Sequence, residues 1–244
     1  MKNLIAFLVL TIFAEPMMAT TLNTEPTTST KYVYAFSGLK LRAQPKSDGQ
    51  VLKVIPYGDK VTILEESKNS ATIEWLSGKW VKVIHEGEEG YLFEGFISDL
   101  PIPNYKFEMT QSDLDLTYPI LAWTEYHYAE VKTPDTIHNE TLDQVIQHLE
   151  DGITLTRRDT PHDFKVVLEL PDTNIAAAYN LVKSMLMTQP ERVTFENKSL
   201  FIDNLKGKIH RIKVNVDNPV ELRQMEDGST KIIVTAYHHG CDIY

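Results

Sequence analysis

The pattern of apolar and polar positions between residues 31 and 100 predicts a series of short β-strands. Each run mixes β-branched and aromatic side chains, and Gly, Pro and Asp stand between the runs as turn formers. The predicted strands cover residues 32–35, 39–42, 50–55, 60–64, 80–84 and 91–93. Strands this short, with turns this frequent, indicate a small β-barrel or sandwich that ends at the prolines of residues 100–103.

Beyond residue 104 the spacing of apolar residues predicts two helices. The first, over residues 141–152, has an apolar stripe formed by Leu142, Val145, Ile146 and Leu149. The second begins after residues 171–173, buries an apolar face between Ile175 and Leu186, and is expected to end before Pro190. Both helices are expected to lie on a mostly antiparallel sheet.

Alternating apolar and polar residues predict the strands of that sheet. They cover residues 164–170, 192–195, 199–202, 212–216, 220–225 and 231–236. Glu226-Asp227-Gly228-Ser229 has the turn chemistry of a β-hairpin and joins the last two strands. The predicted fold class is therefore mainly β, with a small N-terminal barrel followed by an α+β domain over residues 105–244 that contains an antiparallel sheet and two helices.

The first 31 residues predict export. Lys2 precedes an apolar run that is shorter than the roughly 20 residues of a membrane span, and this fits a signal peptide over residues 1–19. Residues 20–31 are rich in Thr and are expected to form a linker. No cysteine follows the apolar run to carry a lipid, so the mature chain is expected to be periplasmic or secreted, without a membrane span.

The charge of the chain limits the classes of partner. Asp and Glu outnumber Lys and Arg by 34 to 24, which gives a formal net charge of −10. An acidic surface repels nucleic acid and anionic membranes, so neither is expected as a partner. Cys241 is the only cysteine, so no disulfide can form within the chain.

Five pieces of the N-terminal segment, in this order, resemble a bacterial SH3-like domain, a module often found outside the cytoplasm. The first reads Ser-Gly-Leu-Lys-Leu-Arg-Ala-Gln-Pro and is similar to the family's opening Gly-Leu-Asn-Val-Arg stretch. The pieces are residues 37–45, 51–55, 57–64, 78–83 and 90–98. The resemblance covers residues 32–101 and implies a small β-barrel. Lys40 departs from the pattern by replacing the usual Asn, and residues 69–77 lengthen one connection.

The resemblance implies a binding module without a cofactor. Its expected partner is a peptide, a peptidoglycan fragment or a protein of the cell envelope. A barrel this small cannot enclose all of its aromatic rings, so some are expected to line an exposed groove that grips an extended ligand. The residues expected to supply these contacts are Tyr34, Trp80, Tyr91 and Phe93.

The chain shows no recognised catalytic constellation. Cysteine peptidases that carry such domains need a Cys at the start of a helix and a His downstream, whereas Cys241 has neither. His238, His239 and Cys241 are acceptable zinc ligands, but adjacent residues of a strand point to opposite faces, so no metal site is expected. Glu125 has aromatic neighbours, as the acid of a sugar cleft would, but it fits better as an exposed acid on an alternating strand.

These residues leave two functions open. The first is an exported, non-catalytic binding protein whose SH3-like domain holds cell-wall peptide or a protein segment. The second is a cell-envelope hydrolase with catalysis in residues 105–244, targeted to its substrate by the SH3-like domain. A pocket in the C-terminal domain with converging acid and base side chains would favour the hydrolase. An exposed aromatic groove on the barrel would favour the binding protein.

Overall fold

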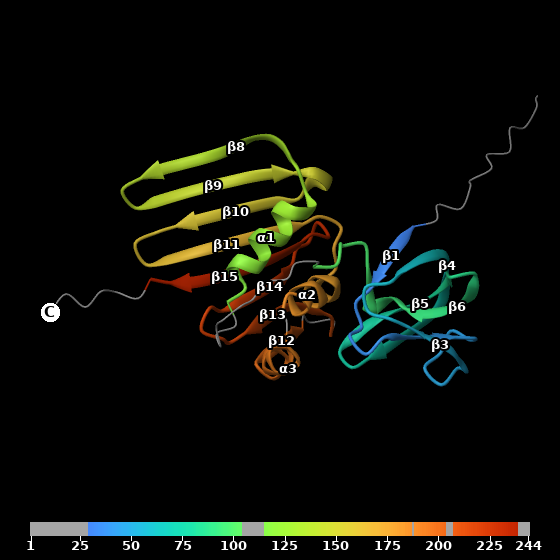
Figure 1. Ribbon diagram of the computed structural model, residues 1–244. Coiled ribbons are helices and arrows are strands. Elements are labelled where there is room, and N and C mark those ends of the chain that lie inside the picture. The colour runs from blue at the N-terminus through green and yellow to red at the C-terminus, as the bar shows by residue number, and fades with distance from the viewer. Residues whose placement is uncertain (1–28, 104–114, 187, 204–206, 239–244) are drawn as a thin grey trace, which may run out of the picture.

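The computed structural model describes residues 29–103, 115–186, 188–203 and 207–238 (Figure 1). Two antiparallel sheets dominate these residues, so the chain is mainly β, as the sequence predicts. The predicted signal peptide, most of the predicted linker, and the residues His239 and Cys241 lie outside the described residues.

The N-terminal sheet is curled into a small barrel of seven strands. They are β1 (Thr30–Val33), β2 (Leu39–Arg42), β3 (Val51–Ile55), β4 (Lys60–Ile73), β5 (Leu76–His85), β6 (Glu88–Phe93) and β7 (Ile97–Ser98). They pair in the order β3-β2-β6-β5-β4-β1-β7, and the short helix η1 (Glu94–Phe96) precedes β7. Leu41, Val83 and Leu92 are fully buried in the barrel core, because alternate residues of a strand point to the same face.

The β4–β5 hairpin covers part of the outer face of the barrel. Val81 and Leu92 point into the core, so their neighbours Trp80 and Phe93 lie on the opposite face. There the end of the hairpin, including Ile73 and Trp75, packs against these two rings. The connection that the sequence shows to be lengthened therefore encloses aromatic rings that a shorter hairpin would leave in water.

The second domain is built on a wider sheet. Its eight strands are β8 (Glu130–Asn139), β9 (Leu142–Leu149), β10 (Thr154–Asp159), β11 (Asp163–Leu170), β12 (Ser199–Asp203), β13 (Ile209–Val214), β14 (Val220–Gln224) and β15 (Thr230–Tyr237). They pair antiparallel in the order β12-β13-β14-β15-β11-β10-β9-β8, and the short helix η2 (Glu150–Gly152) follows β9. Three helices accompany the sheet: α1 (Thr117–His127), α2 (Ile175–Ser184) and α3 (Gln189–Asn197).

Helices α1 and α2 cover one face of this sheet (Figure 1). Val166 of β11, Leu222 of β14 and Val234 of β15 are buried on that face by their position in register. They belong to the same apolar cluster as Trp123 of α1 and Val182 of α2. The sequence therefore predicted correctly the helix that begins at residue 175, the strand over residues 164–170 and the hairpin that ends the sheet.

The helix predicted over residues 141–152 is wrong, because most of this segment is strand β9. This strand pairs with β8 along one edge and with β10 along the other, so its backbone is hydrogen-bonded on both sides. Leu142 and Ile146 point to one face of the sheet, and Val145 and Leu149 point to the other. Four apolar residues divided between two faces of a strand happen to have the spacing of a helical stripe.

The helices of the second domain also differ in number and place from the prediction. Residues 192–195, predicted as a strand, lie within α3. Thr188 and Glu191 form a capping box at the start of this helix, and Pro190 lies in its first turn, where proline is favoured. With α1 in a segment expected to be extended, the domain has three helices rather than two.

The connection between the domains is held by a shared core. Tyr34 after β1 and Leu100 after β7 belong to the same buried cluster as Trp123 of α1. The Tyr34 hydroxyl donates to the carbonyl oxygens of Leu100 and Pro101, each at 3.0 Å. Trp123 Nε1 donates to the same Pro101 carbonyl at 3.0 Å. Barrel and second domain are thus packed as one body at this connection.

The β4–β5 hairpin and helix α2 form a second contact between the domains. The ring of Trp75 lies 5.1 Å from that of Tyr179 in α2 and 4.4 Å from that of Phe201 in β12, measured between centroids. The buried Asn180 of α2 donates from Nδ2 to the carbonyl oxygen of Gly95, at 3.0 Å. Aromatic packing and a buried hydrogen bond therefore fix α2 against the barrel.

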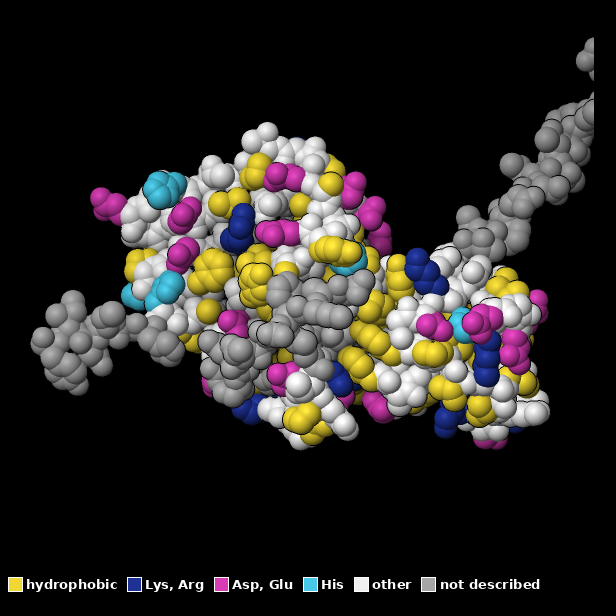
Figure 2. All heavy atoms as spheres, viewed as in Figure 1, with side chains coloured by type: hydrophobic (Ala, Val, Ile, Leu, Met, Phe, Trp, Pro, Cys, Tyr) yellow, Lys and Arg dark blue, Asp and Glu magenta, His cyan; other side chains and the backbone are white. Residues whose placement is uncertain are grey.

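Acidic side chains are spread over both domains on the face shown in Figure 2. Several basic side chains pair with acidic neighbours, among them Lys79 with Glu66 and Arg211 with Glu221. None of the helices in the described ranges has the length and hydropathy of a membrane span. Because the chain has a formal net charge of −10, a cluster of cations on its surface would be a local exception.

Candidate functional site

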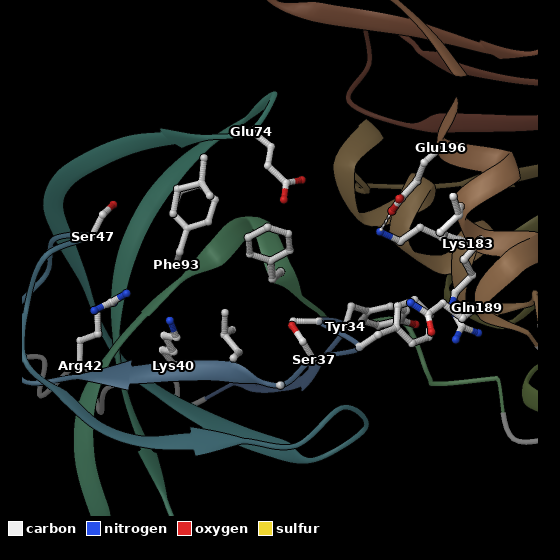
Figure 3. Close-up of a pocket in the computed structure, with 18 of the residues that line it drawn as sticks. Tyr34, Ser37, Lys40, Arg42, Ser47, Glu74, Phe93, Lys183, Gln189 and Glu196 are labelled. Atoms are coloured by element: carbon white, nitrogen blue, oxygen red, sulfur yellow. Dashed lines mark hydrogen bonds and ion pairs between the residues drawn. The ribbon is translucent and has the colours of Figure 1, made fainter. Parts of the chain in front are cut away.

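A cavity of about 790 Å³ lies between the barrel and helices α2 and α3 (Figure 3). One wall consists of residues 34–40, Arg42 and the tip of the β4–β5 hairpin, and the other consists of side chains from α2 and α3. Ligand sites commonly have volumes of about 300–1,000 Å³. We call this cavity the interdomain groove, because neither domain forms it alone.

Three aromatic rings form the apolar floor of the interdomain groove. Phe93 lies 6.0 Å from Trp80 and 5.8 Å from Phe96, measured between ring centroids. Trp80 and Phe93 are only 3% and 1% exposed, because the β4–β5 hairpin packs over them. The expectation that these two rings are open to solvent is therefore wrong, and they border the groove as part of a packed cluster.

Tyr34 is also buried, at 1% exposure, although it borders the interdomain groove. Its hydroxyl is satisfied by the carbonyl oxygens of Leu100 and Pro101. Burial, with a smaller contribution from Tyr57, raises the pKa of Tyr34 far above its ordinary value. Tyr34 was expected to contact ligand in an exposed groove, and its burial beneath the connection between the domains contradicts that exposure.

Tyr91 is the remaining residue expected to contact ligand. It is half-buried in β6, where it packs against the cluster of Trp80 and Phe93, and it does not line the interdomain groove. Of the four expected contact residues, the groove therefore brings together Tyr34, Trp80 and Phe93 and leaves out Tyr91.

Phe36 is the exposed aromatic ring of the interdomain groove, with 36% of its surface accessible. It stacks on Tyr57 at a centroid distance of 4.7 Å and an interplanar angle of 15°. The guanidinium carbon of Arg192 lies 4.2 Å from the centroid of Phe36, and Arg192 Nη1 donates to the carbonyl oxygen of Leu186 at 2.8 Å. These contacts hold an aromatic face and a cation side by side in the lining of the groove.

Neither Phe36 nor Arg192 was expected from the sequence as a site residue. The Thr188-x-x-Glu191 spacing is a capping-box signal and could have placed Arg192 on a helix. Nothing in the spacing shows that this helix lies against the barrel, because that contact depends on the packing of two distant segments.

Charged side chains line both walls of the interdomain groove. The cations are Lys40, Arg42, Lys183 and Arg192, and the acids are Glu74 and Glu196. Lys183 Nζ pairs with Glu196 Oε1 at 2.8 Å, as the dashed line in Figure 3 shows. The groove therefore combines an apolar floor with charged walls in which basic groups are in excess.

The barrel sequence matches a known family. The family model described as the bacterial SH3 domain matches residues 37–98. These residues form a bacterial SH3 domain. The resemblance stated from the sequence is thereby confirmed, and modules of this family are typically cell-wall binding domains. No curated protein and no solved structure matches the chain.

A second cavity, of about 860 Å³, also lies between the SH3 domain and the second domain. Trp75 and Glu94 of the SH3 domain line it, together with His210 and Glu226 of the second domain. The buried Nδ1 of His210 has no hydrogen-bond partner among the described residues. A catalytic histidine is normally oriented by a hydrogen bond to its second ring nitrogen, and this cavity does not supply one from the described chain.

The other residues considered from the sequence do not line the interdomain groove. Glu125 is exposed on α1, so the strand expected there is wrong, while the neighbouring Trp123 is fully buried. His238 Nε2 lies 2.8 Å from Asp159 Oδ1 at the far end of the second sheet. In the described part of the chain, no group of three or more His, Cys, Asp or Glu side chains could hold a metal ion.

Proposed function

We propose that this protein is an exported, non-catalytic binding protein of the bacterial cell envelope. The SH3 domain and the second domain together hold an extended peptide, either of the cell wall or of an envelope protein, in the interdomain groove. Export rests on the signal-peptide pattern of residues 1–19, and the cell-wall setting rests on the family of residues 37–98.

The observation that carries this proposal is the groove itself. It has the volume of a ligand site, exposed apolar side chains (Phe36 and Val193) from which a ligand can displace water, and polar groups on both walls that can fix the orientation of a ligand. Phe36 offers an exposed ring face whose position is already held by Tyr57 and Arg192. A ring that is fixed before binding loses little conformational freedom when a peptide stacks on it.

A cell-envelope hydrolase is the alternative function. The specific observation in its favour is the second cavity, where His210 and Glu226 share one lining. Against it stands the missing orienting partner of His210 among the described residues. The binding protein therefore accounts for more of the geometry.

Retention on insoluble cell walls tests the proposed function. The full mature chain is mixed with purified cell-wall sacculi, and the bound fraction is measured after sedimentation over a range of protein concentrations. Phe36→Ala should weaken the apparent affinity by about five- to tenfold, as expected for loss of one stacking ring worth about 1 kcal/mol or slightly more. Tyr126→Ala removes an exposed ring outside the groove and should leave retention unchanged.

Equal retention of the wild type and Phe36→Ala would contradict the groove as the binding site. Soluble fragments released from the sacculi over time would instead favour the hydrolase, and loss of that release in His210→Ala would place the chemistry in the second cavity.

A further inference from the structure

Strand β2 carries two of the four cations that line the interdomain groove, Lys40 and Arg42. Leu39 and Leu41 point into the barrel core, so Lys40 and Arg42 share the opposite face, which lines the groove. Two residues along a strand are separated by about 7 Å, so the two charged groups can address adjacent parts of one ligand. Figure 3 shows both side chains on this wall. Lys40 is also the position at which the chain departs from the Asn usual in the family.

The cations of the groove differ in whether a carboxylate neutralises them. Lys183 is paired with Glu196 at 2.8 Å. Arg42 Nη1 donates to the carbonyl oxygen of Gly49, at 2.6 Å, which orients the guanidinium without cancelling its charge. Lys40 is exposed, and no described carboxylate pairs with it.

The charge that remains in the groove is positive. After Lys183 and Glu196 cancel, Lys40 and Arg42 remain in the lining with a single further acid, Glu74. This excess stands out against a chain whose formal net charge is −10. A cationic recess on an acidic protein attracts anionic groups locally, while the rest of the surface repels them.

We propose that the interdomain groove selects peptides that carry free carboxylates, and that Lys40 and Arg42 bind those carboxylates. This inference rests on the proposed function, since it names the class of peptide that the groove accepts. The exposed Val193 of the groove lining contacts the aliphatic part of the peptide, and Phe36 stacks on its backbone. The cationic wall of β2 pairs with its carboxylates. An amidated peptide of the same length keeps the apolar contacts and loses the ionic ones.

A pair of matched synthetic peptides tests this selection by isothermal titration calorimetry with the full mature chain. One is N-acetylated Ala-Glu-Lys-Ala-Ala with a free C-terminus, and the other is N-acetylated Ala-Gln-Lys-Ala-Ala with an amidated C-terminus. The free-acid peptide should bind about tenfold more tightly, as expected for two partly exposed ion pairs. Raising the salt concentration should reduce this difference, because exposed charges are screened.

Variants assign the effect to the groove. Lys40→Gln and Arg42→Gln should each weaken binding of the free-acid peptide by about three- to fivefold, with little change for the amidated peptide. Lys68→Gln removes an exposed lysine of the same barrel outside the groove and should change neither affinity.

The possible failures are distinguishable. Equal affinity for the two peptides would overturn carboxylate selection and leave groove binding intact. A free-acid preference that survives in Lys40→Gln and Arg42→Gln would overturn the assignment to β2. Binding of neither peptide, together with no retention on cell walls, would overturn the proposed function itself.

Discussion

Trp75 provides a direct test of how the SH3 domain is fixed to the second domain. The residue lies at the end of the β4–β5 hairpin, and its ring contacts Tyr179 and Phe201 of the second domain. It also packs against the rings of the groove floor. Trp75→Ala removes all of these contacts together, so it should loosen the junction that shapes the interdomain groove.

The expected loss follows from the partial burial of Trp75. Replacing a fully buried Trp or Phe by Ala costs about 3–5 kcal/mol. Trp75 keeps part of its surface in water, so we expect a loss of about 2–3 kcal/mol in the free energy of unfolding. For a chain of this size, 1 kcal/mol corresponds to about 2–4 °C in Tm, so the Tm should fall by about 4–12 °C.

Differential scanning calorimetry measures this change. The wild type should unfold in a single transition, because the two domains share one core, and Trp75→Ala should lower or split that transition. Tyr126→Ala is the matched control, since it removes a large ring that is 68% exposed on α1 and should cost less than about 0.5 kcal/mol. A Tm for Trp75→Ala equal to that of the wild type would refute the reasoning.

Three further changes probe other parts of the fold. Asn180→Ala leaves the Gly95 carbonyl without its donor, so chemical denaturation should show a loss of about 1–3 kcal/mol; an unchanged midpoint would exclude this hydrogen bond as a stabilising contact. Gly90→Ala places a Cβ 2.7 Å from Leu41 Cγ, so the same measurement should show a loss of about 1–3 kcal/mol. Burial lowers the pKa of His127, so as the pH falls the unfolded chain binds a proton before the folded chain does. The free energy of unfolding should therefore decrease below about pH 6.5. The Tm of His127→Phe should depend less on pH than that of the wild type, and an identical pH dependence would contradict this.

Local chemistry explains which parts of the fold were predictable. The Asp227-Gly228 turn fixes its hairpin through residues that are adjacent in sequence, and Asn174 caps α2 through its bond to the Ala177 amide. The barrel could be predicted because the residues of the family pattern stand at fixed positions within one short segment. The apolar spacing of residues 142–149 predicted the wrong element, since four apolar residues fit both a helical stripe and a strand that carries apolar residues on both faces.

The site was less predictable than the fold because its two walls are distant in sequence. The burial of Trp80 depends on a hairpin whose length was visible in the sequence but whose direction was not. Phe36 and Arg192 meet only because α3 lies against the barrel, and no local spacing encodes that contact. The sequence shows that Lys40 replaces the Asn usual in the family. Its position in the cationic wall of the groove depends on how β2 and the helices pack together.

The most direct test of the interdomain groove is a chemical-shift map recorded by NMR. The isotopically labelled mature chain is titrated with the free-acid peptide, and the amide signals of Ser37 and Gln189, on opposite walls, are followed. Binding in the groove predicts saturable shifts of both signals with one dissociation constant. Shifts confined to one domain, or centred on Tyr91, would contradict a site that both domains build.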